Sequence, residues 1–191
     1  MEFDPEIIEK ITEKAQNKLS NVSRFNPYTR RVLQQSDWVE SLKASITGFA
    51  QIFDNLTKSL KSLTEAVDKE AFVQDFKRLL DECVHHSALL SLQHCEIIKK
   101  YLRPASIIEK QKVDRDLQRY WERLDNSIQA MNAEVKSTHG RAKMLGVWDE
   151  LSAMHPLIAR LETIDLSMAR ANLLNGELIL GDDMEEFEPY L

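Results

Sequence analysis

The clearest pattern in the chain is a run of apolar residues from Val39 to Val67, whose spacings alternate between three and four. This periodicity, kept over four heptads, predicts a long amphipathic helix. The stripe consists of Val39, Leu42, Ile46, Phe49, Phe53, Leu56, Leu60, Leu63 and Val67. The positions beside the stripe are mostly small or uncharged, and Ile52 makes the stripe wider. A wide stripe is typical of a helix that packs against two neighbours in a bundle, rather than of a two-stranded coiled coil.

The phase of this pattern changes after Val67. A new stripe begins at Phe72, and it comprises Phe72, Phe76, Leu79, Cys83, His86, Leu90, Ile97 and Tyr101, joined by Val73, Leu80, Val84 and Leu102. We therefore expect a helical hairpin in which Asp68 caps the start of the second helix. Because neither Gly nor Pro marks a turn here, one continuous helix that extends past Arg103 is the alternative.

A third long helix is expected to begin after Pro104. Ser106 and Glu109 have the spacing of a capping box, and Gly140 is interpreted as the stop of this helix. Its apolar stripe consists of Val113, Leu117, Trp121, Leu124, Ile128, Met131 and Val135.

The last helix is expected to end at Asn175–Gly176, and Pro156 must kink or split it because proline removes a backbone donor. Its stripe consists of Val147, Trp148, Leu151, Met154, Ile158, Leu161, Ile164, Met168 and Leu173.

These stripes predict an all-α protein. Short turns between long helices make neighbouring helices antiparallel, so residues 37–175 are expected to form an elongated, up-down-up-down four-helix bundle. Residues 1–19 are predicted to form a short N-terminal amphipathic helix, and residues 20–36 a linker. Residues 176–191 form an acidic and hydrophobic tail.

Charge is distributed unevenly along the 191 residues. The chain carries 25 Lys and Arg against 31 Asp and Glu, a net charge of −6. Residues 176–191 hold six acids and no base, so the remaining 175 residues are neutral. A neutral body lacks the broad positive field that general nucleic-acid binding requires, so we expect no nucleic-acid partner.

The cellular compartment is inferred from what the sequence lacks. No apolar run approaches the roughly 20 residues that span a bilayer, and the acidic first residues do not resemble a secretory signal. Cys83 and Cys95 lie twelve residues apart on one predicted helix, too far apart to bridge. Two free, buried thiols fit a reducing compartment, and we expect the cytoplasm, with the nucleus as the alternative.

The strongest candidate for a reactive cluster is Glu82, His85, His86, His94 and Cys95 on the second predicted helix. Glu82 and His85 have the Glu-x-x-His spacing of di-metal bundle sites, but the chain contains no second such motif. We therefore interpret His86 as a residue at the core edge, His85 as exposed and the thiols as structural. Since the chain also lacks phosphate-loop and nucleophile-elbow motifs, we expect no enzyme activity, no metal and no cofactor.

The tail is the most unusual segment. Its apolar run, residues 178–180, and its acidic flank resemble a SUMO-interacting motif, which implies addition as a strand to a sheet edge. We predict that the tail contacts a partner through Leu178, Ile179, Leu180, Asp182, Asp183, Phe187, Tyr190 and Leu191. The alternative is that residues 178–180 pack on the bundle. A basic patch of Arg24, Arg30 and Arg31 is the candidate contact for an anionic partner, or for the chain's own tail.

Together these features favour a non-enzymatic helical module for protein–protein interaction: an adaptor, scaffold or assembly subunit. On this hypothesis, removal of residues 177–191 leaves the fold intact and weakens partner capture. The first alternative is a membrane-associating or membrane-inserting bundle that acts through residues 1–19, although the neutral body does not favour it. The second alternative is a metal- or cofactor-binding bundle that uses Glu82, His85 and His86. Homo-oligomerisation is compatible with each of these hypotheses.

Overall fold

The computed structural model describes residues 38–63, 68–154, 157–177, 179 and 180. Within these ranges the protein is all-α, with no strand. The helices are α3 (Trp38–Leu63), α4 (Lys69–Ile97), η1 (Ile98–Leu102), α5 (Ile107–Leu145), α6 (Trp148–Met154), α7 (Leu157–Thr163) and α8 (Leu166–Asn175). None of them is long and apolar enough to cross a membrane.

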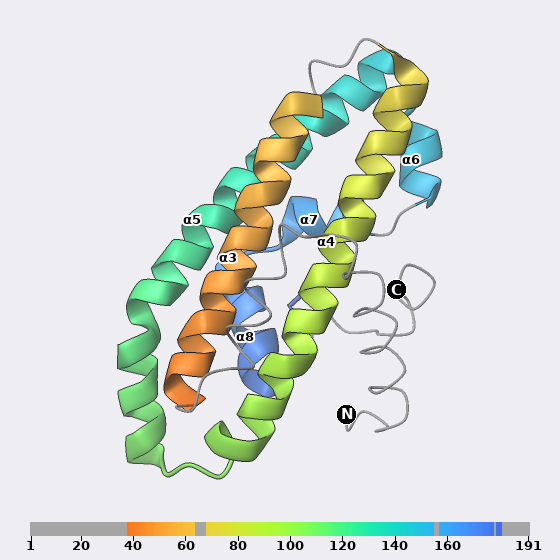
Figure 1. Ribbon diagram of the computed structural model, residues 1–191. Coiled ribbons are helices and arrows are strands. Elements are labelled where there is room, and N and C mark those ends of the chain that lie inside the picture. The colour runs from red at the N-terminus through yellow and green to blue at the C-terminus, as the bar shows by residue number, and fades with distance from the viewer. Residues whose placement is uncertain (1–37, 64–67, 155–156, 178, 181–191) are drawn as a thin grey trace, which may run out of the picture.

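Three long helices, α3, α4 and α5, form the frame of the molecule and run antiparallel to their neighbours in the chain (Figure 1). Helix α3 packs against both α4 and α5. The expectation that its wide stripe serves two neighbours is thus confirmed, and Ile52 is buried. After Gly146 the chain returns alongside this frame as three short helices, of which α7 and α8 contact both α4 and α5.

The core lies between these helices. Its largest fully buried side chains are Trp121, Phe49, Phe53, Phe72, Phe76, Leu42, Ile46, Leu60, Leu80, Leu89, Leu90 and Ile98. Most of these residues belong to the predicted stripes. Two members of the predicted stripes are exposed rather than buried: Tyr101 and Met168 are each 39% exposed. Tyr101 lies in the wider π-helical turn η1, which places Leu102 in the core instead.

The predicted hairpin between the first two long helices is confirmed. The side chain of Asp68 accepts a hydrogen bond of 3.0 Å from the Glu70 amide, so it caps the start of α4. The alternative of one continuous helix is wrong, because α3 and α4 pack against each other. The capping box of Ser106 and Glu109 at the start of α5 is confirmed as well.

Gly140 does not end the third long helix, and this expectation is corrected. Helix α5 continues to Leu145, and Gly146 is its left-handed cap, with φ of 73°. The stripe extends beyond Gly140 through the fully buried Ala142, so core contacts continue the helix past an isolated glycine. A single glycine in a helix costs only about 1 kcal/mol, which packing offsets.

The last predicted helix corresponds to α6, α7 and α8. Residues 155–156, between α6 and α7, lie outside the described residues, so the kink or split expected at Pro156 stays a prediction. A division that the pattern did not indicate comes before Asp165, whose side chain accepts a 2.7 Å hydrogen bond from the Met168 amide and caps α8. Gly176, with φ of 74°, ends α8 at the expected position.

Candidate interaction site at the turn between α4 and α5

The turn between α4 and α5 is held by local hydrogen bonds. In η1 the Arg103 amide donates to the Ile98 carbonyl at 2.9 Å, and the Ala105 amide donates to the Leu102 carbonyl at 3.2 Å. The Glu109 carboxylate then accepts 2.8 Å bonds from both the amide and the hydroxyl of Ser106. These bonds lower the pKa of Glu109. A reciprocal cap of this kind fixes where α5 begins.

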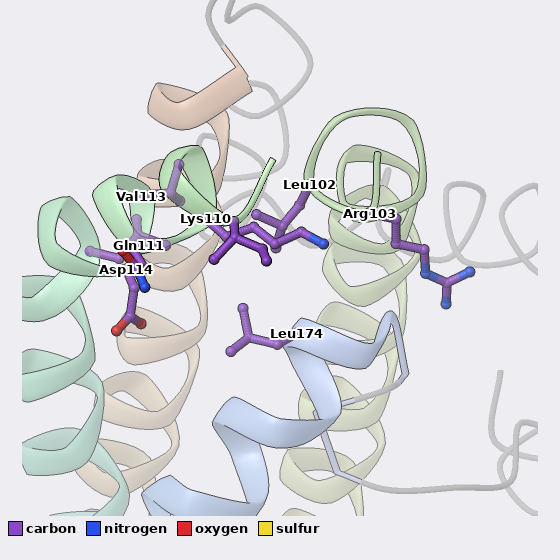
Figure 2. A pocket seen from close by; sticks show the side chains of 9 residues that line it. Leu102, Arg103, Lys110, Gln111, Val113, Asp114 and Leu174 are labelled. Atoms are coloured by element: carbon purple, nitrogen blue, oxygen red, sulfur yellow. The ribbon is translucent and has the colours of Figure 1, made fainter. Parts of the chain in front are cut away.

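A pocket of about 420 Å³ lies beside this turn, and we call it the tip pocket. It is lined by Leu102, Arg103, Ile107, Lys110, Gln111, Val113, Asp114, Leu117 and Leu174. Leu102, Val113 and Leu117 are buried core residues, so the inner wall of the pocket is apolar. Figure 2 shows Leu102 and Lys110 near one another on one side of the pocket and Leu174 of α8 facing them. The pocket therefore combines an apolar floor with a polar rim.

Two exposed isoleucines flank the tip pocket. Ile107 is 75% exposed and Ile108 is 77% exposed, although both are large aliphatic residues. They lie in the first turn of α5, ahead of Val113, which is the first buried residue of this helix. Tyr101 adds a partly exposed aromatic ring, which stacks on Trp38 with 5.9 Å between ring centroids. Adjacent exposed aliphatic residues are typical of a surface that binds something.

The same region is strongly basic. Residues 98–113, which we call the basic tip, contain five basic residues and one acid, a net charge of +4 in a chain of net charge −6. The basic residues are Lys99, Lys100, Arg103, Lys110 and Lys112. The single acid, Glu109, is engaged in the capping box. Residues 98–113 therefore carry a local positive charge that the total charge does not reveal.

Two polar contacts connect the rim of the pocket to α8. The Arg103 guanidinium donates a 2.8 Å hydrogen bond to the Asn175 carbonyl at the end of α8. Asp114 forms an ion pair with Arg170, whose guanidinium also lies 5.6 Å from the centroid of the Trp121 ring. Since Asp114 is paired in this way, it neutralises little of the charge of Lys110 beside it.

The histidines and thiols of α4 do not form a reactive cluster. His94 Nδ1 lies 2.5 Å from the Ser45 hydroxyl, and the two residues are 1% and 0% exposed. His86 is buried as expected, whereas His85 is half-buried rather than exposed. Glu82 pairs with Arg78 at 2.8 Å. In the described part of the chain, no three His, Cys, Asp or Glu residues are grouped as metal ligands would be.

Burial also makes both thiols unreactive. The pKa of Cys83 is raised to about 12 by burial, against a weaker opposing effect of the Ser87 hydroxyl. Burial likewise raises the pKa of Cys95 to about 12. The expectation of two free, buried cysteines is confirmed.

Another histidine, His139, lies where α5, α6 and α7 meet. His139 Nδ1 is 2.5 Å from the Glu162 carboxylate, and its ring stacks on Trp148 with 3.4 Å between centroids. The His139 and Glu162 side chains are each 21% exposed. These contacts join three helices and serve the fold.

Of the predicted tail contacts, only Ile179 and Leu180 lie in the described residues, and both are buried, at 0% and 6% exposure. The Ile179 amide donates to the Ser91 hydroxyl at 3.4 Å, and Arg160 donates to the Leu180 carbonyl at 2.9 Å. Packing of this run on the bundle, the alternative interpretation, is confirmed for these two residues. Removal of residues 177–191 would thus delete two core side chains, so the expectation that it leaves the fold intact is corrected.

The other predicted contacts lie outside the described residues. They are Leu178, Asp182, Asp183, Phe187, Tyr190 and Leu191 of the tail, Arg24, Arg30 and Arg31 of the basic patch, and the helix predicted for residues 1–19. They stay predictions.

Sequence reasoning missed the basic tip, although two signals for it were present. Ile107 and Ile108 are apolar residues that do not fit the stripe of their own helix. The five basic residues of the tip are separated by Pro104 and belong to two different helices, so a search along each helix does not bring them together. The turn does so in space.

The comparisons add no relative from which a function could be transferred. No protein-family description, no curated protein and no solved structure matches this chain.

Proposed function

We propose that this chain is a non-enzymatic helical module for protein–protein interaction that binds its partner at the basic tip. In this proposal the scaffold is an up-down-up-down four-helix bundle, in which α6, α7 and α8 together take the place of the fourth helix. The observation that carries the proposal is the pair Ile107 and Ile108, each at least 75% exposed, beside an apolar pocket. Leaving two large aliphatic side chains in water is unfavourable, and a partner that covers them removes this cost.

The chemistry of the site indicates the class of partner. A pocket of about 420 Å³ with an apolar floor accommodates one or two bulky apolar side chains. The basic rim favours a partner segment with acidic residues around such an anchor, because opposite charges steer the encounter and fix its register. We therefore expect an acidic peptide segment or helix with an aromatic or aliphatic anchor.

The polar groups in the interior support a structural role rather than a catalytic one. Ser45 and His94 form a serine–histidine hydrogen bond, and both side chains are buried in the core. Nucleophilic catalysis requires such a pair to reach a substrate. Histidine and serine act here as a packed polar contact between α3 and α4.

The proposal is tested by partner capture with a matched control. The full chain, the double variant Ile107→Ser with Ile108→Ser, and Met144→Ser are immobilised and exposed to extract of the native source. Met144 lies at the other end of α5 and is 80% exposed, so it controls for the loss of any exposed apolar residue. A true partner is captured by the full chain and by Met144→Ser, and at least about tenfold less by the double variant.

The captured protein is then purified and its direct binding to the same three proteins is measured by calorimetry. If no protein depends on the two isoleucines, or if the purified protein fails to bind the full chain, the proposal is wrong. Equal thermal unfolding temperatures of the three proteins show that the double variant is folded.

An anionic membrane is the second candidate for the basic tip. Adjacent isoleucines at a turn, among five basic residues, also suit shallow insertion between acidic headgroups. The concave pocket favours a protein segment instead. Co-sedimentation with phosphatidylcholine vesicles that contain or lack phosphatidylserine separates the two: binding that requires phosphatidylserine and is lost in the double variant supports the membrane.

A further inference from the structure

After α8 the chain turns back along α4, away from the turn: the Glu177 carbonyl accepts a 3.8 Å hydrogen bond from the Cys95 thiol, and the Leu180 carbonyl accepts a 2.9 Å bond from Arg160 of α7. The Ile179 carbonyl accepts a 3.5 Å hydrogen bond from the Asn172 amide group, and the Ile179 amide is bonded to Ser91. Asn172 lies two residues before Leu174, which lines the pocket, so the two are about 3 Å apart along α8. These bonds fix the point at which the segment from residue 181 onward begins.

This segment is long enough to reach the pocket. Residues 181–191 are eleven residues, which span at most about 36–40 Å when extended. Ser91, which the Ile179 amide contacts, precedes Leu102 of the pocket by eleven residues, or about 17 Å along α4 and η1. The extended segment is therefore about twice as long as this separation.

The composition of the segment matches the chemistry of the pocket. Residues 181–191 contain five acids and no base, interleaved with Met184, Phe187, Tyr190 and Leu191. The basic tip has a net charge of +4 and offers an apolar floor. Acidic residues around an aromatic anchor are also the features that we propose for a partner of this site.

We propose that residues 181–191 bind the tip pocket of their own chain and compete there with the partner. An aromatic residue of the segment occupies the apolar floor, and the flanking acids face Lys110 and Lys112. As a regulatory device this rests on the proposed function, because only a pocket that binds partners can be blocked by a competitor. Occupancy in cis does not depend on any partner and is measured separately.

Binding in cis raises the local concentration of the competitor. A short tether provides an effective concentration in the millimolar range, so even a weak contact keeps the pocket filled. An external partner must then displace the segment. The apparent affinity for that partner falls in proportion to the fraction of open pockets.

The test is site-specific photo-cross-linking in the full chain. The photoreactive analogue p-benzoylphenylalanine is introduced at Phe187, and cross-linked peptides are mapped by mass spectrometry. The expected cross-links join residue 187 to residues 98–117 or to Leu174. Mixing with an isotopically heavy chain that lacks the analogue distinguishes the cis contact, which stays within light chains, from contacts between two copies.

Charge variants show whether the basic tip holds the segment. Lys110→Glu with Lys112→Glu is expected to lower the cross-link yield by at least about fivefold. The matched control is Lys136→Glu with Lys143→Glu, two exposed positions nearer the other end of the same helix, which leaves the yield unchanged. Thermal unfolding followed by circular dichroism verifies that both variants are folded.

Three outcomes overturn the inference: cross-links that map elsewhere or do not form, cross-links that join light to heavy chains, and equal yields in the two charge variants. The capture experiment can succeed while this one fails, which would leave an interaction module without a built-in competitor. If instead cross-linking succeeds and no partner depends on Ile107 and Ile108, the cis contact is real and the proposed function is wrong.

Discussion

The Ser45 hydroxyl and the His94 imidazole lie 2.5 Å apart, although 49 positions separate the two residues in the chain. The same hydroxyl lies 2.9 Å from the Leu42 carbonyl, to which it donates its single proton. The edge of the Phe49 ring closes one side of the imidazole, with 6.2 Å between centroids.

This buried histidine predicts a loss of stability in mild acid. Burial lowers the pKa of His94 to about 4, with a partial opposing effect of the Leu173 carbonyl. In the unfolded chain its pKa returns to about 6.5, so the unfolded state binds the proton first. The free energy of unfolding should therefore fall as the pH decreases from about 6.5 to about 4, by up to roughly 3 kcal/mol.

Urea unfolding at pH 7, 6 and 5 measures this loss, and His94→Gln should flatten the dependence. His85→Gln, at a half-buried position on the same helix, should retain the slope of the original chain. Equal slopes in the two variants would show that His94 is not the group responsible.

The two cysteines should resist thiol reagents as long as the protein is folded. Both thiols are 3% exposed, and burial raises their pKa values to about 12, so almost no thiolate is present near neutral pH. Ellman's reagent at pH 8 should detect no rapidly reacting thiol in the native chain and both thiols in guanidinium. Ser137→Cys, at an exposed position of α5, should add one rapidly reacting thiol. Rapid reaction of the unaltered chain would contradict the burial of Cys83 or Cys95.

Local signals predicted the parts of the fold that depend on a few consecutive residues. The cap of Asp68 on α4, the box of Ser106 and Glu109, and the stop at Gly176 are each made by residues within a few positions of one another. The long apolar stripes likewise predict which residues are buried, because the period of an α-helix determines which side chains share a face.

The other features of the fold and the site depend on contacts between residues far apart in the chain, and such contacts cannot be read from a single sequence. The pairing of Ser45 with His94 depends on how α3 and α4 are aligned. The short apolar run at Ile179 and Leu180 has the composition of either a docking segment or a packed one, and the choice depends on Ser91 and Arg160, which lie far away in the chain. The basic tip is hidden for the same reason, since its charges come from both sides of a turn.

The capping box makes a measurable contribution to stability. Ser106→Ala removes the hydroxyl that accepts from the Glu109 amide, and it should lower the free energy of unfolding by about 1 kcal/mol. Ser137→Ala, at an exposed position nearer the C-terminal end of the same helix, should leave stability unchanged or raise it slightly, since alanine is the better helix former. Chemical denaturation of both variants measures the difference. Equal stabilities would mean that α5 does not depend on this cap.

Two glycines of α5 should respond in opposite ways to the same substitution. Gly140 is exposed within the helix, and a Cβ atom added there meets nothing within 4 Å. Gly140→Ala should therefore raise the free energy of unfolding by about 0.5–1 kcal/mol, because alanine loses less backbone entropy on folding.

Gly146 has φ of 73°, a left-handed conformation that is unfavourable for residues with a Cβ atom. Gly146→Ala should lower stability by about 1 kcal/mol, although it too has open space around it. Urea unfolding in one buffer compares both variants with Ala133→Gly, an exposed position on the same helix that should lose about 1 kcal/mol. A stabilising Gly146→Ala would show that α5 does not end in a left-handed cap, and a destabilising Gly140→Ala would show that the helix does not continue through residue 140.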